Sequence, residues 1–520
     1  MNGAQALLRS LVASGVEVCF ANPGTSEMHF VAALDDVPRM RAVLTLFEGV
    51  ATGAADGYGR MAGHPAATLL HLGPGLGNGL ANLHNARRAG TPVVAVIGDH
   101  ATTHTRFDAP LQSDIDALAG AVSGWVRRAA TARDVGPDTA AAVAAATGPP
   151  GQVATLILPA DASWTEGAEP APPAEPDGAG DRQIDPDALD AAAKALTSGE
   201  PCVLLVGGDT TGEGGLAAAN RIAAATGAKL LAETFPPRLT RGAGVAPVNR
   251  LGYAPDMATH QLRGAAHLVL VGARSPVTFF GYPDKPGDLV PDGCRVHAVA
   301  PKDGAAAAAL DALADLVAPG TTAALAQPGR PALPSGPLTV ETAAAVVGAL
   351  LPEGAVVVDE AITSSMGLPA ATAGAPRHDW LSVTGGAIGY GLPAAVGAAL
   401  ACPERPVWCL EADGSAMYTI SALWTQAREG LDVTTVLYNN SAYAILRMEL
   451  AQVGAVGDGE RARALFDLGS PRLDFTALAE GMGVPARRAT TAEELADALR
   501  RAQAEPGPHL VEAVLPPLAP

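Results

Sequence analysis

Basic residues are scarce in this chain of 520 residues. Lysine and arginine together number 34 against 53 aspartates and glutamates, so the formal net charge at neutral pH is −19. No run of basic residues occurs anywhere in the sequence. Proteins that bind nucleic acid neutralise phosphates with clustered lysine and arginine, whereas this chain would repel a phosphate backbone. Nucleic acid is therefore not expected as a partner.

Cysteines and long apolar runs are also scarce. The five cysteines are scattered, odd in number and without a CxxC pair: Cys19, Cys202, Cys294, Cys402 and Cys409. This pattern fits a reducing compartment and predicts neither a disulfide framework nor a zinc site. No uncharged apolar run reaches the roughly 18 residues of a membrane span. Arg9 and Glu17 interrupt the N-terminal apolar stretch, which argues against a signal peptide. The sequence predicts a soluble, cytoplasmic protein without a membrane partner.

Apolar material, by contrast, is plentiful, since hydrophobic residues make up 48% of the chain and charged residues 17%. At roughly 100–200 residues per domain, the length predicts about three domains. Residues 166–187 and 318–337 are rich in Pro, Gly and Ala and lack periodicity, so both are expected to be exposed connections. They divide the chain into predicted domains at 1–165, 188–317 and 338–520.

Each predicted domain contains short Val/Ile/Leu runs that alternate with Ala-rich stretches. The runs are TPVVAVIGD at 91–99, PCVLLVGGD at 201–209, AHLVLVGA at 266–273 and GAVVVDE at 354–360. Near-continuous apolar strands between helices are typical of parallel sheets covered on both faces. The predicted fold class is α/β, with three doubly wound parallel-sheet domains.

The first and third domains share an internal sequence similarity. GNGLANLHNA from Gly77 is followed by PVVAVIGD at 92–99, and GYGLPAAVGA from Gly389 is followed by PVWCLEAD at 406–413. Chance similarity between α/β units is one explanation. The other is that two domains have one ancestry, with a different domain between them.

Asp413 and Asn440 form the strongest local signal for chemistry. EADGS ends a predicted strand, a helix is expected over about 416–429, and DVTTVLYNN ends the next strand at Asn440, 27 residues after Asp413. Parallel strands end at the same sheet edge, where α/β folds bind ligands. A carboxylate, an amide oxygen and a nearby backbone carbonyl suit Mg²⁺, and Ser415 with the helix N–H groups could bind phosphate. Asp-Gly and Asn-Asn are also ordinary turn dipeptides, which is the alternative.

Glu48 is the second signal. It follows an apolar run and opens a helix of small residues in LTLFEGVATGAADGYGRM. An acid in the first helical turn can simply interact with the helix dipole. Because Leu46, Phe47 and Val50 flank it, its carboxyl could instead lie in a dry pocket and exchange a proton near neutral pH.

Together these segments resemble the superfamily of thiamine-diphosphate-dependent 2-oxo acid decarboxylases and acetolactate synthases, over essentially the whole chain. The resemblance implies a pyrimidine-binding first domain, a middle domain, and a third domain that binds the diphosphate. It implies that Asp413, Asn440 and the carbonyl of Ala442 bind Mg²⁺, although Ala412 stands where the family has Gly. It also implies that Glu48 hydrogen-bonds the aminopyrimidine ring. The implied cofactor neighbours are the apolar wedge Ile388 and Gly386, Gly414, Ser415 and Tyr443.

Within the superfamily, the motifs are most similar to those of benzoylformate decarboxylases. NPGTS places Thr25 at the active-site hydroxyl, HLGPGLGN places His71 and Asn78, and TISALWTQA at 419–427 matches a helix of that family. The resemblance makes His71 and Thr25 catalytic candidates beside Glu48. One departure is large: PVTFFGYPDKPG lacks the family's second catalytic His, and Phe279, Phe280 or Gly281 falls near its position.

The substrate pocket is predicted from fewer signals. His100 and His104 lie in a loop comparable to the one that carries the paired His residues of pyruvate decarboxylases, but they could also be plain surface residues. Ile445 and Leu446 follow Asn-Asn and would make the pocket apolar, with Phe280 nearby. A pocket with few charges favours a 2-oxo acid with an uncharged side chain.

The resemblance implies decarboxylation of a 2-oxo acid through an enamine, with release of an aldehyde. Because one proton donor is missing, a carboligase that couples the enamine to a second carbonyl fits about as well. FAD is not expected.

A nicotinamide dehydrogenase is disfavoured by the absence of GxGxxG with its ribose-binding acid. A non-catalytic homologue is disfavoured by the presence of Glu48, Asp413 and Asn440. A homodimer or homotetramer is implied, with each active site between the first domain of one subunit and the third of another.

Overall fold

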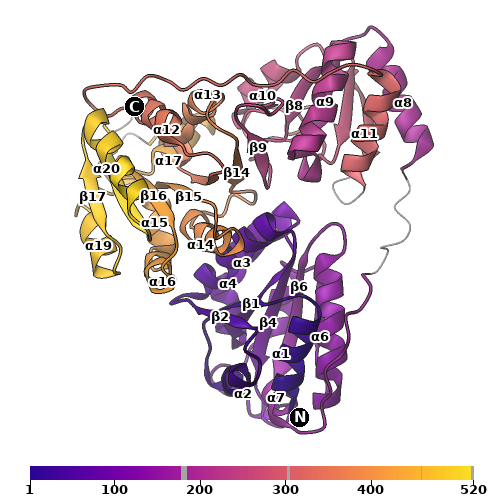
Figure 1. Cartoon of the computed structure of the whole chain (residues 1–520), viewed down its shortest axis with the longest axis vertical. Coiled ribbons are helices and arrows are strands. Elements are labelled where there is room, and N and C mark those ends of the chain that lie inside the picture. Colours follow the sequence, from indigo (N-terminus) through magenta and orange to yellow (C-terminus); the bar gives the residue numbers. More distant parts are fainter. Residues whose placement is uncertain (177–183, 301–304, 458, 517–520) are drawn as a thin grey trace.

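The computed structural model describes residues 1–176, 184–300, 305–457 and 459–516. Within these residues the strands form three sheets, each covered by helices, which confirms the predicted α/β class. Figure 1 shows the first unit below the other two, with the third unit and the middle unit side by side above it. No helix in this described part of the chain is long and apolar enough to cross a membrane.

The first unit is built on a six-stranded parallel sheet. Its strand order is β2-β1-β3-β4-β6-β5. The strands are β1 (Val18–Ala21), β2 (Arg41–Leu44), β3 (Ala66–His71), β4 (Val93–Asp99), β5 (Trp125–Arg128) and β6 (Val153–Pro159). The helices are α1 (Gly3–Ala13), α2 (Met28–Ala33), α3 (Glu48–Ala62), α4 (Leu72–Ala89), α5 (Ile115–Gly120), α6 (Ala132–Thr147) and α7 (Ala160–Trp164).

The middle unit has a five-stranded sheet in the order β10-β8-β7-β11-β12. Its strands are β7 (Cys202–Val206), β8 (Lys229–Ala232), β10 (Asn249–Arg250), β11 (His267–Val271) and β12 (Arg295–Ala300). Its helices are α8 (Pro186–Thr197), α9 (Glu213–Thr226), α10 (Pro255–Leu262) and α11 (Ala306–Val317).

The third unit has a seven-stranded sheet in the order β17-β18-β16-β15-β13-β14-β9. Its strands are β13 (Val356–Glu360), β14 (His378–Ser382), β15 (Val407–Ala412), β16 (Val433–Asn439), β17 (Ala486–Ala489), β18 (His509–Val514) and β9 (Leu239–Arg241). Its helices are α12 (Val340–Leu350), α13 (Leu368–Ala371), α14 (Gly391–Ala401), α15 (Asp413–Thr419), α16 (Ala422–Glu429), α17 (Ala444–Gln452), α18 (Glu460–Ala464), α19 (Phe475–Gly481) and α20 (Ala492–Ala504).

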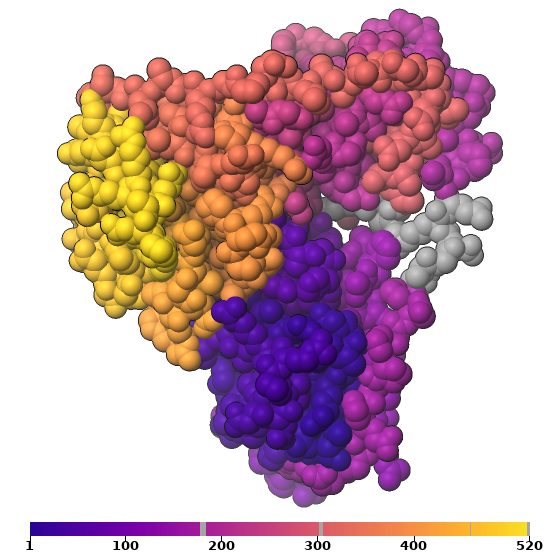
Figure 2. Space-filling view, viewed as in Figure 1, coloured from indigo at the N-terminus to yellow at the C-terminus, as the bar shows by residue number. Residues whose placement is uncertain are grey.

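The edge strand β9 departs from the predicted pattern. It comes from the middle part of the sequence, yet it pairs antiparallel with β14, while the other named pairings in the described residues are parallel. The middle and third units are therefore joined by backbone hydrogen bonds as well as by side chains. Figure 2 shows these two units in continuous contact at the top of the molecule.

The first and third units share one topology. When β9 is set aside, the six parallel strands of both sheets run in the same order, counted along the chain as 2-1-3-4-6-5. The shared topology agrees with a common ancestry of the two units, but the internal sequence similarity aligns the wrong elements. It pairs α4 and β4, which follow the third strand, with α14 and β15, which follow the second. The equivalent of α14 is α3, because both connect the second strand to the third.

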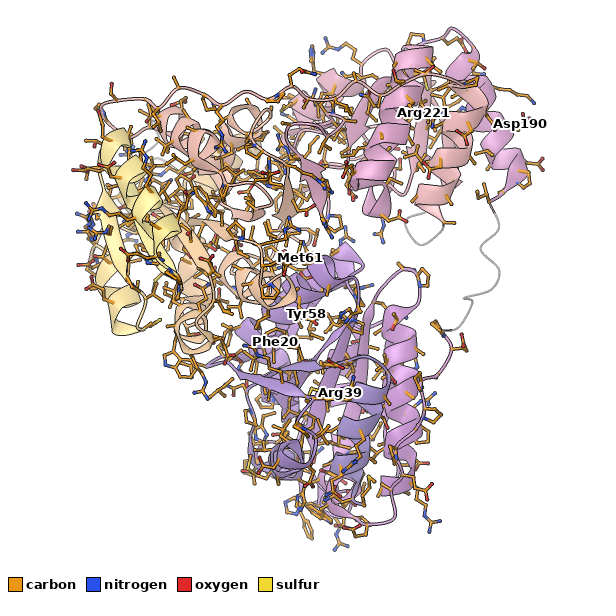
Figure 3. All side chains as sticks on the ribbon, in the orientation of Figure 1. Phe20, Arg39, Tyr58, Met61, Asp190 and Arg221 are labelled. Carbon is orange, nitrogen blue, oxygen red and sulfur yellow. The ribbon has the colours of Figure 1, made fainter. Side chains whose placement is uncertain are left out.

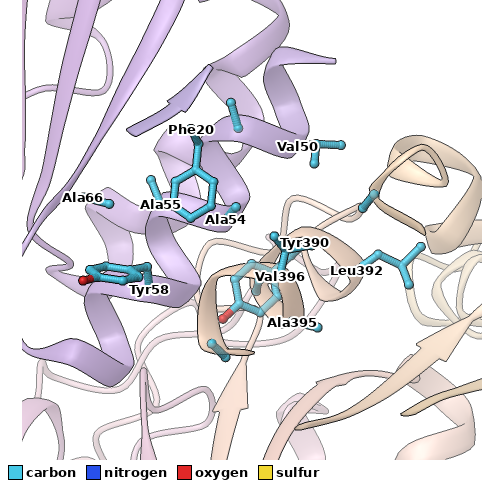
Figure 4. Close-up of a cluster of buried hydrophobic side chains, with 14 of the residues drawn as sticks. Phe20, Val50, Ala54, Ala55, Tyr58, Ala66, Tyr390, Leu392, Ala395 and Val396 are labelled. Carbon is cyan, nitrogen blue, oxygen red and sulfur yellow. The ribbon is translucent and has the colours of Figure 1, made fainter. Parts of the chain in front are cut away.

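These two equivalent helices pack against each other and join the first and third units. A Cβ built on Gly57 would lie 2.2 Å from the carbonyl oxygen of Ala394, and one built on Gly397 would lie 1.9 Å from that of Ala54. Glycine at both positions therefore allows the helix backbones to approach closely. Figure 3 places Met61 and Tyr58 where the units meet. Figure 4 shows Val50 and Ala54 of α3 facing Leu392 and Ala395 of α14 in one buried cluster.

The predicted connections are mostly exposed, with exceptions. Ala168 is buried, and its backbone N–H donates to the carbonyl of Met1, so the start of the first connection packs on the first unit. Ala318 is buried at the start of the second. Residues 177–183 of the first connection lie outside the described residues. The limits 1–165, 188–317 and 338–520 remain a prediction.

Candidate functional site

Asp413 and Asn440 lie at the carboxyl ends of the neighbouring strands β15 and β16, as predicted. The loop after β16 turns back onto Asp413, because the Ser441 N–H donates to Asp413 Oδ2 at 2.7 Å. The other oxygen of Asp413 accepts from the Gly414 N–H at 2.8 Å. The Asn440 side-chain oxygen accepts from the N–H of Ala442 at 2.9 Å. The carboxylate, the amide and Ala442 are therefore brought together in one bonded loop.

The donor set at this edge fits a hard cation. Burial raises the pKa of the Asp413 carboxyl to about 6, although backbone N–H groups oppose the shift. A buried carboxylate, an amide oxygen and the Ala442 carbonyl are oxygen ligands of the kind that Mg²⁺ prefers, with water and phosphate completing the shell. No group of three or more His, Cys, Asp or Glu side chains that could hold a metal occurs among the described residues. The magnesium assignment stays a prediction.

Gly414, Ser415 and Tyr443 surround this loop. A Cβ on Gly414 would lie 2.4 Å from Tyr443 Cε1, so the Tyr443 ring leaves room only for glycine there. Ser415 is buried in the first turn of α15. The expected helix over 416–429 is wrong in detail, since α15 already begins at Asp413 and a break at Ile420 and Ser421 separates it from α16.

Glu48 opens α3, as predicted. The Asn78 side-chain amide donates to Glu48 Oε2 at 3.0 Å, which joins two candidates from α3 and α4. A Cβ on Gly75 would lie 3.1 Å from Glu48 Oε1. Glu48 is partly exposed and Leu46 is 51% exposed, so the expected dry pocket does not form around the carboxyl within one chain.

His71 ends β3 and is held by a carboxylate that the sequence analysis missed. Its Nδ1 lies 2.8 Å from Oε2 of Glu27, and the Gly24 N–H donates to the same oxygen at 2.7 Å. Glu27 is buried, and its Oε1 has no hydrogen-bond partner among the described residues. Burial raises the pKa of Glu27, while the nearby His71 opposes the shift. Because Nδ1 is engaged, Nε2 is the ring nitrogen left for a ligand.

Thr25 stands two residues before Glu27 and is exposed. The NPGTSE segment therefore places a free hydroxyl-bearing residue and the partner of His71 in one short turn. A Cβ on Gly24 would lie 2.3 Å from the His71 ring, so this turn and the imidazole are packed closely. The signal that could have identified Glu27 is an acid directly after the motif, in a helical turn at the carboxyl end of β1.

The segment containing Gly386 and Ile388 is held by a buried carboxyl pair. Glu360, at the end of β13, accepts from the N–H groups of Gly389, Tyr390 and Gly391 at 2.9, 2.8 and 2.6 Å. Glu411 of β15 lies beside Glu360, and burial raises the pKa of Glu360 to about 7 and that of Glu411 well above its usual range. The neighbouring Glu360 carboxyl adds to the effect of burial in raising the pKa of Glu411. Ile388 itself is half-buried.

The remaining candidates lie on two loops and α17. The rings of His100 and His104 lie 5.4 Å apart between centroids in a tilted arrangement, with Phe107 next to His104. His104 is exposed, while His100 is half-buried and its Nε2 has no partner among the described residues. Phe280 is 52% exposed. Ile445 and Leu446 occupy the first turn of α17, with Leu446 pointing to solvent at 42% exposure.

The candidates for catalysis and for cofactor binding thus fall into two groups. One contains Glu48, Asn78, His71 and Thr25 in the first unit, and the other contains the Asp413 loop with Gly386 and Tyr443 in the third. No hydrogen bond joins the two groups within the part of the chain that the structure describes. Sequence reasoning missed Glu27, Glu360 and Glu411. The last two carry only a weak signal, an acid near the end of a buried strand.

Two parts of the chain match models of known protein families. Residues 1–119 match the family model "Thiamine pyrophosphate enzyme, N-terminal TPP binding domain", and residues 364–513 match "Thiamine pyrophosphate enzyme, C-terminal TPP binding domain". The first match contains Glu48 and His71, and the second contains Asp413 and Asn440.

Two curated relatives cover nearly the whole chain. One, from Mycobacterium tuberculosis, has a name that provisionally assigns it as the acetolactate synthase large subunit IlvX; it is 65% identical over 100% of both chains. Benzoylformate decarboxylase of Pseudomonas aeruginosa is 33% identical over 96% of both.

A solved structure shows the same similarity in three dimensions. The thiamine diphosphate-dependent 4-hydroxybenzoylformate decarboxylase of Rhodococcus jostii superposes with a TM-score of 0.86 at 26% identity, over 99% of both chains. Since full-length relatives and both cofactor-domain matches agree, the chain belongs to the thiamine pyrophosphate-dependent enzymes, with decarboxylases and acetolactate synthase-like proteins as its relatives.

Proposed function

We propose that this enzyme decarboxylates a 2-oxo acid with thiamine diphosphate and Mg²⁺ and releases an aldehyde. The observation that carries the proposal is the hydrogen-bonded loop that brings the Asp413 carboxylate, the Asn440 amide and Ala442 together at the carboxyl ends of β15 and β16. In a thiamine pyrophosphate-dependent enzyme, a metal at this edge would bind the cofactor's diphosphate.

The chain's own residues divide the remaining work. When bound, thiamine diphosphate supplies the carbon nucleophile and the electron sink for loss of CO₂. Glu48, oriented by Asn78, would hold a proton on its carboxyl at the pyrimidine ring. His71, oriented through Nδ1 by Glu27, would present Nε2 to the substrate and exchange a proton there. Thr25 would offer its hydroxyl to the substrate carboxylate or carbonyl.

The complete site requires a second copy of the chain in this proposal. Glu48 is partly exposed, Leu46 beside it is 51% exposed, and no hydrogen bond reaches from this group to the Asp413 group in the described residues. A homodimer or homotetramer that places the first unit of one subunit on the third unit of another would cover Leu46 and complete the site. A cytoplasmic location remains a prediction.

A carboligase is the second candidate, and one observation favours it. Phe279, Phe280 and Gly281 occupy the middle-unit segment where benzoylformate decarboxylases place a second His, so a proton donor is missing there. Without that donor, protonation after loss of CO₂ is slower and attack on a second carbonyl competes. The product would then be a 2-hydroxy ketone or an acetohydroxy acid.

The test is to incubate the protein with thiamine diphosphate, Mg²⁺ and a panel of 2-oxo acids, and to follow CO₂ and organic products by NMR. Glu48→Gln should lower turnover about a hundredfold to ten-thousandfold, because it removes an acid–base group. Asp413→Asn should weaken cofactor binding measured by calorimetry, since it removes the one carboxylate of the metal site. Glu169→Gln, at an exposed position of the first connection, is the matched control.

The products decide between the two candidates. An aldehyde as the main product supports the decarboxylase, and a coupled hydroxy ketone or acetohydroxy acid supports the carboligase. Tight cofactor binding without consumption of any 2-oxo acid would contradict both.

A further inference from the structure

The β14–α14 connection, residues 383–390, carries Gly386 and Ile388 and is an irregular segment. Gly386 and Gly389 have φ angles of 72° and 87°, in the left-handed region that favours glycine, so the backbone turns on both sides of Ile388. Buried N–H and C=O groups need hydrogen-bond partners. Those of this connection are therefore expected to be bonded by side chains from other elements.

Glu360 bonds the end of the connection. It is 1% exposed, and its carboxylate accepts from three consecutive N–H groups, those of Gly389, Tyr390 and Gly391, at 2.9, 2.8 and 2.6 Å. Burial raises the pKa of Glu360, and these N–H groups oppose the rise, as donors to the charged form do. Because Gly391 begins α14, Glu360 is a built-in anion at the N-terminus of that helix.

Asn85 of α4 bonds the connection from the first unit. Its Nδ2 donates to the carbonyl oxygen of Ala387 at 2.8 Å, and its Oδ1 accepts from the N–H of the same residue at 3.2 Å. The Thr384 hydroxyl donates to the backbone carbonyl of Asn85 at 2.8 Å. Asn85 is fully buried, and a Cβ on Gly385 would lie 2.6 Å from its Oδ1. One side-chain amide thus pairs with both backbone groups of the residue before Ile388.

Asn82, one turn earlier on α4, bonds the connection a second time. Its Nδ2 donates to the carbonyl oxygen of Gly389 at 3.1 Å and to that of Gly49 at 2.9 Å. Its Oδ1 accepts from Nδ2 of Asn85 at 2.9 Å, so the two amides orient each other. The buried Asn82 amide is fixed in this orientation, because a flipped amide would place its oxygen against two carbonyl oxygens.

Asn78, Asn82 and Asn85 share one face of α4, because they are four and three residues apart. Asn78 donates to Glu48, which the proposed function places in a site completed by the third unit of the partner. Asn82 and Asn85 instead contact the third unit of their own chain. In the proposed dimer, one face of α4 therefore contributes to two different sites.

We propose that Asn82, Asn85 and Glu360 are positioning residues, which hold the β14–α14 connection in the form that binds the cofactor. Each chain's α4 thereby shapes the cofactor pocket in the third unit of the same chain. The connection is ordered before thiamine diphosphate arrives, so binding does not have to order it. This inference rests on the proposed function, because the proposed dimer assigns Glu48 of the same chain to the other pocket.

The first test is hydrogen–deuterium exchange of the full-length protein without cofactor. In Asn85→Ala the segment around Ala387 should exchange about tenfold faster, and in Glu360→Gln residues 389–391 should do so, since each variant loses hydrogen bonds to these groups. Strands β4 and β16 should keep their wild-type rates, which separates local opening from a general loss of stability. Wild-type rates throughout the connection in both variants would overturn the proposal. The matched controls, both at exposed positions, are Asn249→Ala and Glu353→Gln.

The second test measures the affinity for thiamine diphosphate by calorimetry at constant Mg²⁺. Asn85→Ala should bind the cofactor about tenfold more weakly than the wild type, because binding must then order the connection. Asn85→Ala is next combined with Asp413→Asn in a mixed dimer that is isolated with two different affinity tags. If Asn85 acts within its own chain, each pocket of this dimer carries one defect, and no site of wild-type affinity should remain.

Asn78→Ala combined with Asp413→Asn is the matched mixed dimer, since it carries the same substitution seven residues earlier on the same helix face. The Asn78→Ala homodimer should also bind the cofactor about tenfold more weakly, because Glu48 loses its partner. In the mixed dimer, however, both defects fall in one pocket, because Asn78 acts with Glu48. One site of wild-type affinity per dimer should therefore remain.

Failure of this inference differs from failure of the proposed function. One site of wild-type affinity in both mixed dimers would overturn the role of Asn85, while the two-subunit site would stand. No such site in either mixed dimer would overturn the two-subunit site of the proposed function. In that case the exchange rates of the β14–α14 connection would decide the positioning role by themselves.

Discussion

At the residue scale, the candidate site depends on side chains that orient other side chains. Glu27 is buried, and one of its oxygens binds both the Gly24 N–H and Nδ1 of His71. This arrangement fixes which imidazole nitrogen faces the site, because the nitrogen bonded to a carboxylate is not free to exchange a proton with a ligand. A change at Glu27 should therefore affect chemistry at His71 without touching the cofactor.

We predict that Glu27→Gln lowers kcat about tenfold to a hundredfold, the range expected when a charge-assisted hydrogen bond worth about 1.5–3 kcal/mol is lost. The affinity for thiamine diphosphate, measured by calorimetry, should stay within about twofold of the wild type, since Glu27 lies in the His71 group and not in the Asp413 loop. His71→Asn should show a similar loss, and the double variant should lose little more, because the two residues act as a unit. Additive losses would contradict the orienting role.

The residues that could be predicted from the sequence are those whose position in an element identifies them. Glu48 opens a helix, and Asp413 and Asn440 end strands, so a linear pattern already places them at a sheet edge. Glu27 and Asn85 could not be predicted in this way. Their partners lie at positions 71 and 387, and only the folded chain brings these segments together.

At the scale of elements, the same distinction holds. The apolar runs at 91–99, 201–209, 266–273 and 354–360 became β4, β7, β11 and β13, because a strand buried on both faces leaves a strong local pattern. The sequence similarity between α4–β4 and α14–β15 aligned elements that are not equivalent in the two sheets, because small residues and strands that begin with Pro-Val suit any βαβ unit. β9 left no signal, since three residues at a sheet edge form a strand only when β14 offers its free edge.

The junction of β9 and β14 contains a histidine that should make stability depend on pH. His378 is 1% exposed, its Nδ1 lies 2.8 Å from the carbonyl oxygen of Pro376, and its Nε2 has no partner among the described residues. Burial lowers its pKa to about 4, with the Pro376 carbonyl opposing and Arg241 contributing in the same direction as burial. The unfolded chain protonates this residue near pH 6.5.

The direction in which stability changes with pH follows from these two pKa values. The folded state binds the proton of His378 less tightly than the unfolded state. The contribution of His378 to the free energy of unfolding is therefore complete above pH 6.5, and it is lost as the pH falls towards 4, by about 1.4 kcal/mol per pH unit. We predict that His378→Gln, which does not titrate, is least stable relative to the wild type at pH 8 and approaches it by pH 4.5. Urea unfolding midpoints of both proteins across this range measure the difference, with the exposed His260→Gln as control. A constant difference would contradict the prediction.

At the scale of the whole molecule, one chain carries the two halves of the proposed site on two sheets of identical topology. α3 and α14 pack together and hold these sheets in a fixed relation. The buried ion pair of Arg60 with Asp56 strengthens the junction, because Arg60 also donates to the carbonyl of Ser382 and the hydroxyl of Thr384. This rigid junction does not bond the Glu48 group to the Asp413 group, which leaves both halves available to a second subunit.

The active site should therefore be rebuilt when two inactive variants are combined. In the proposed homodimer, Glu48→Gln and Asp413→Asn should each remove nearly all activity. In a mixed dimer, one site receives both defects, while the other combines an intact Glu48 from one subunit with an intact Asp413 from its partner. Co-expression with random pairing should make half of the dimers mixed, each with one working site of two, so about a quarter of the wild-type activity should return.

Differential affinity tags on the two variants would isolate the mixed dimer, whose activity should be about half that of the wild type per dimer. The control combines Glu48→Gln with a second tagged copy of Glu48→Gln, in which no pairing can restore a site. If each site were instead formed within one chain, every site of the mixed dimer would carry one defect. In that case the purified mixed dimer would remain as inactive as its parents, because pairing with another subunit cannot replace the defective residue of a site that one chain builds alone.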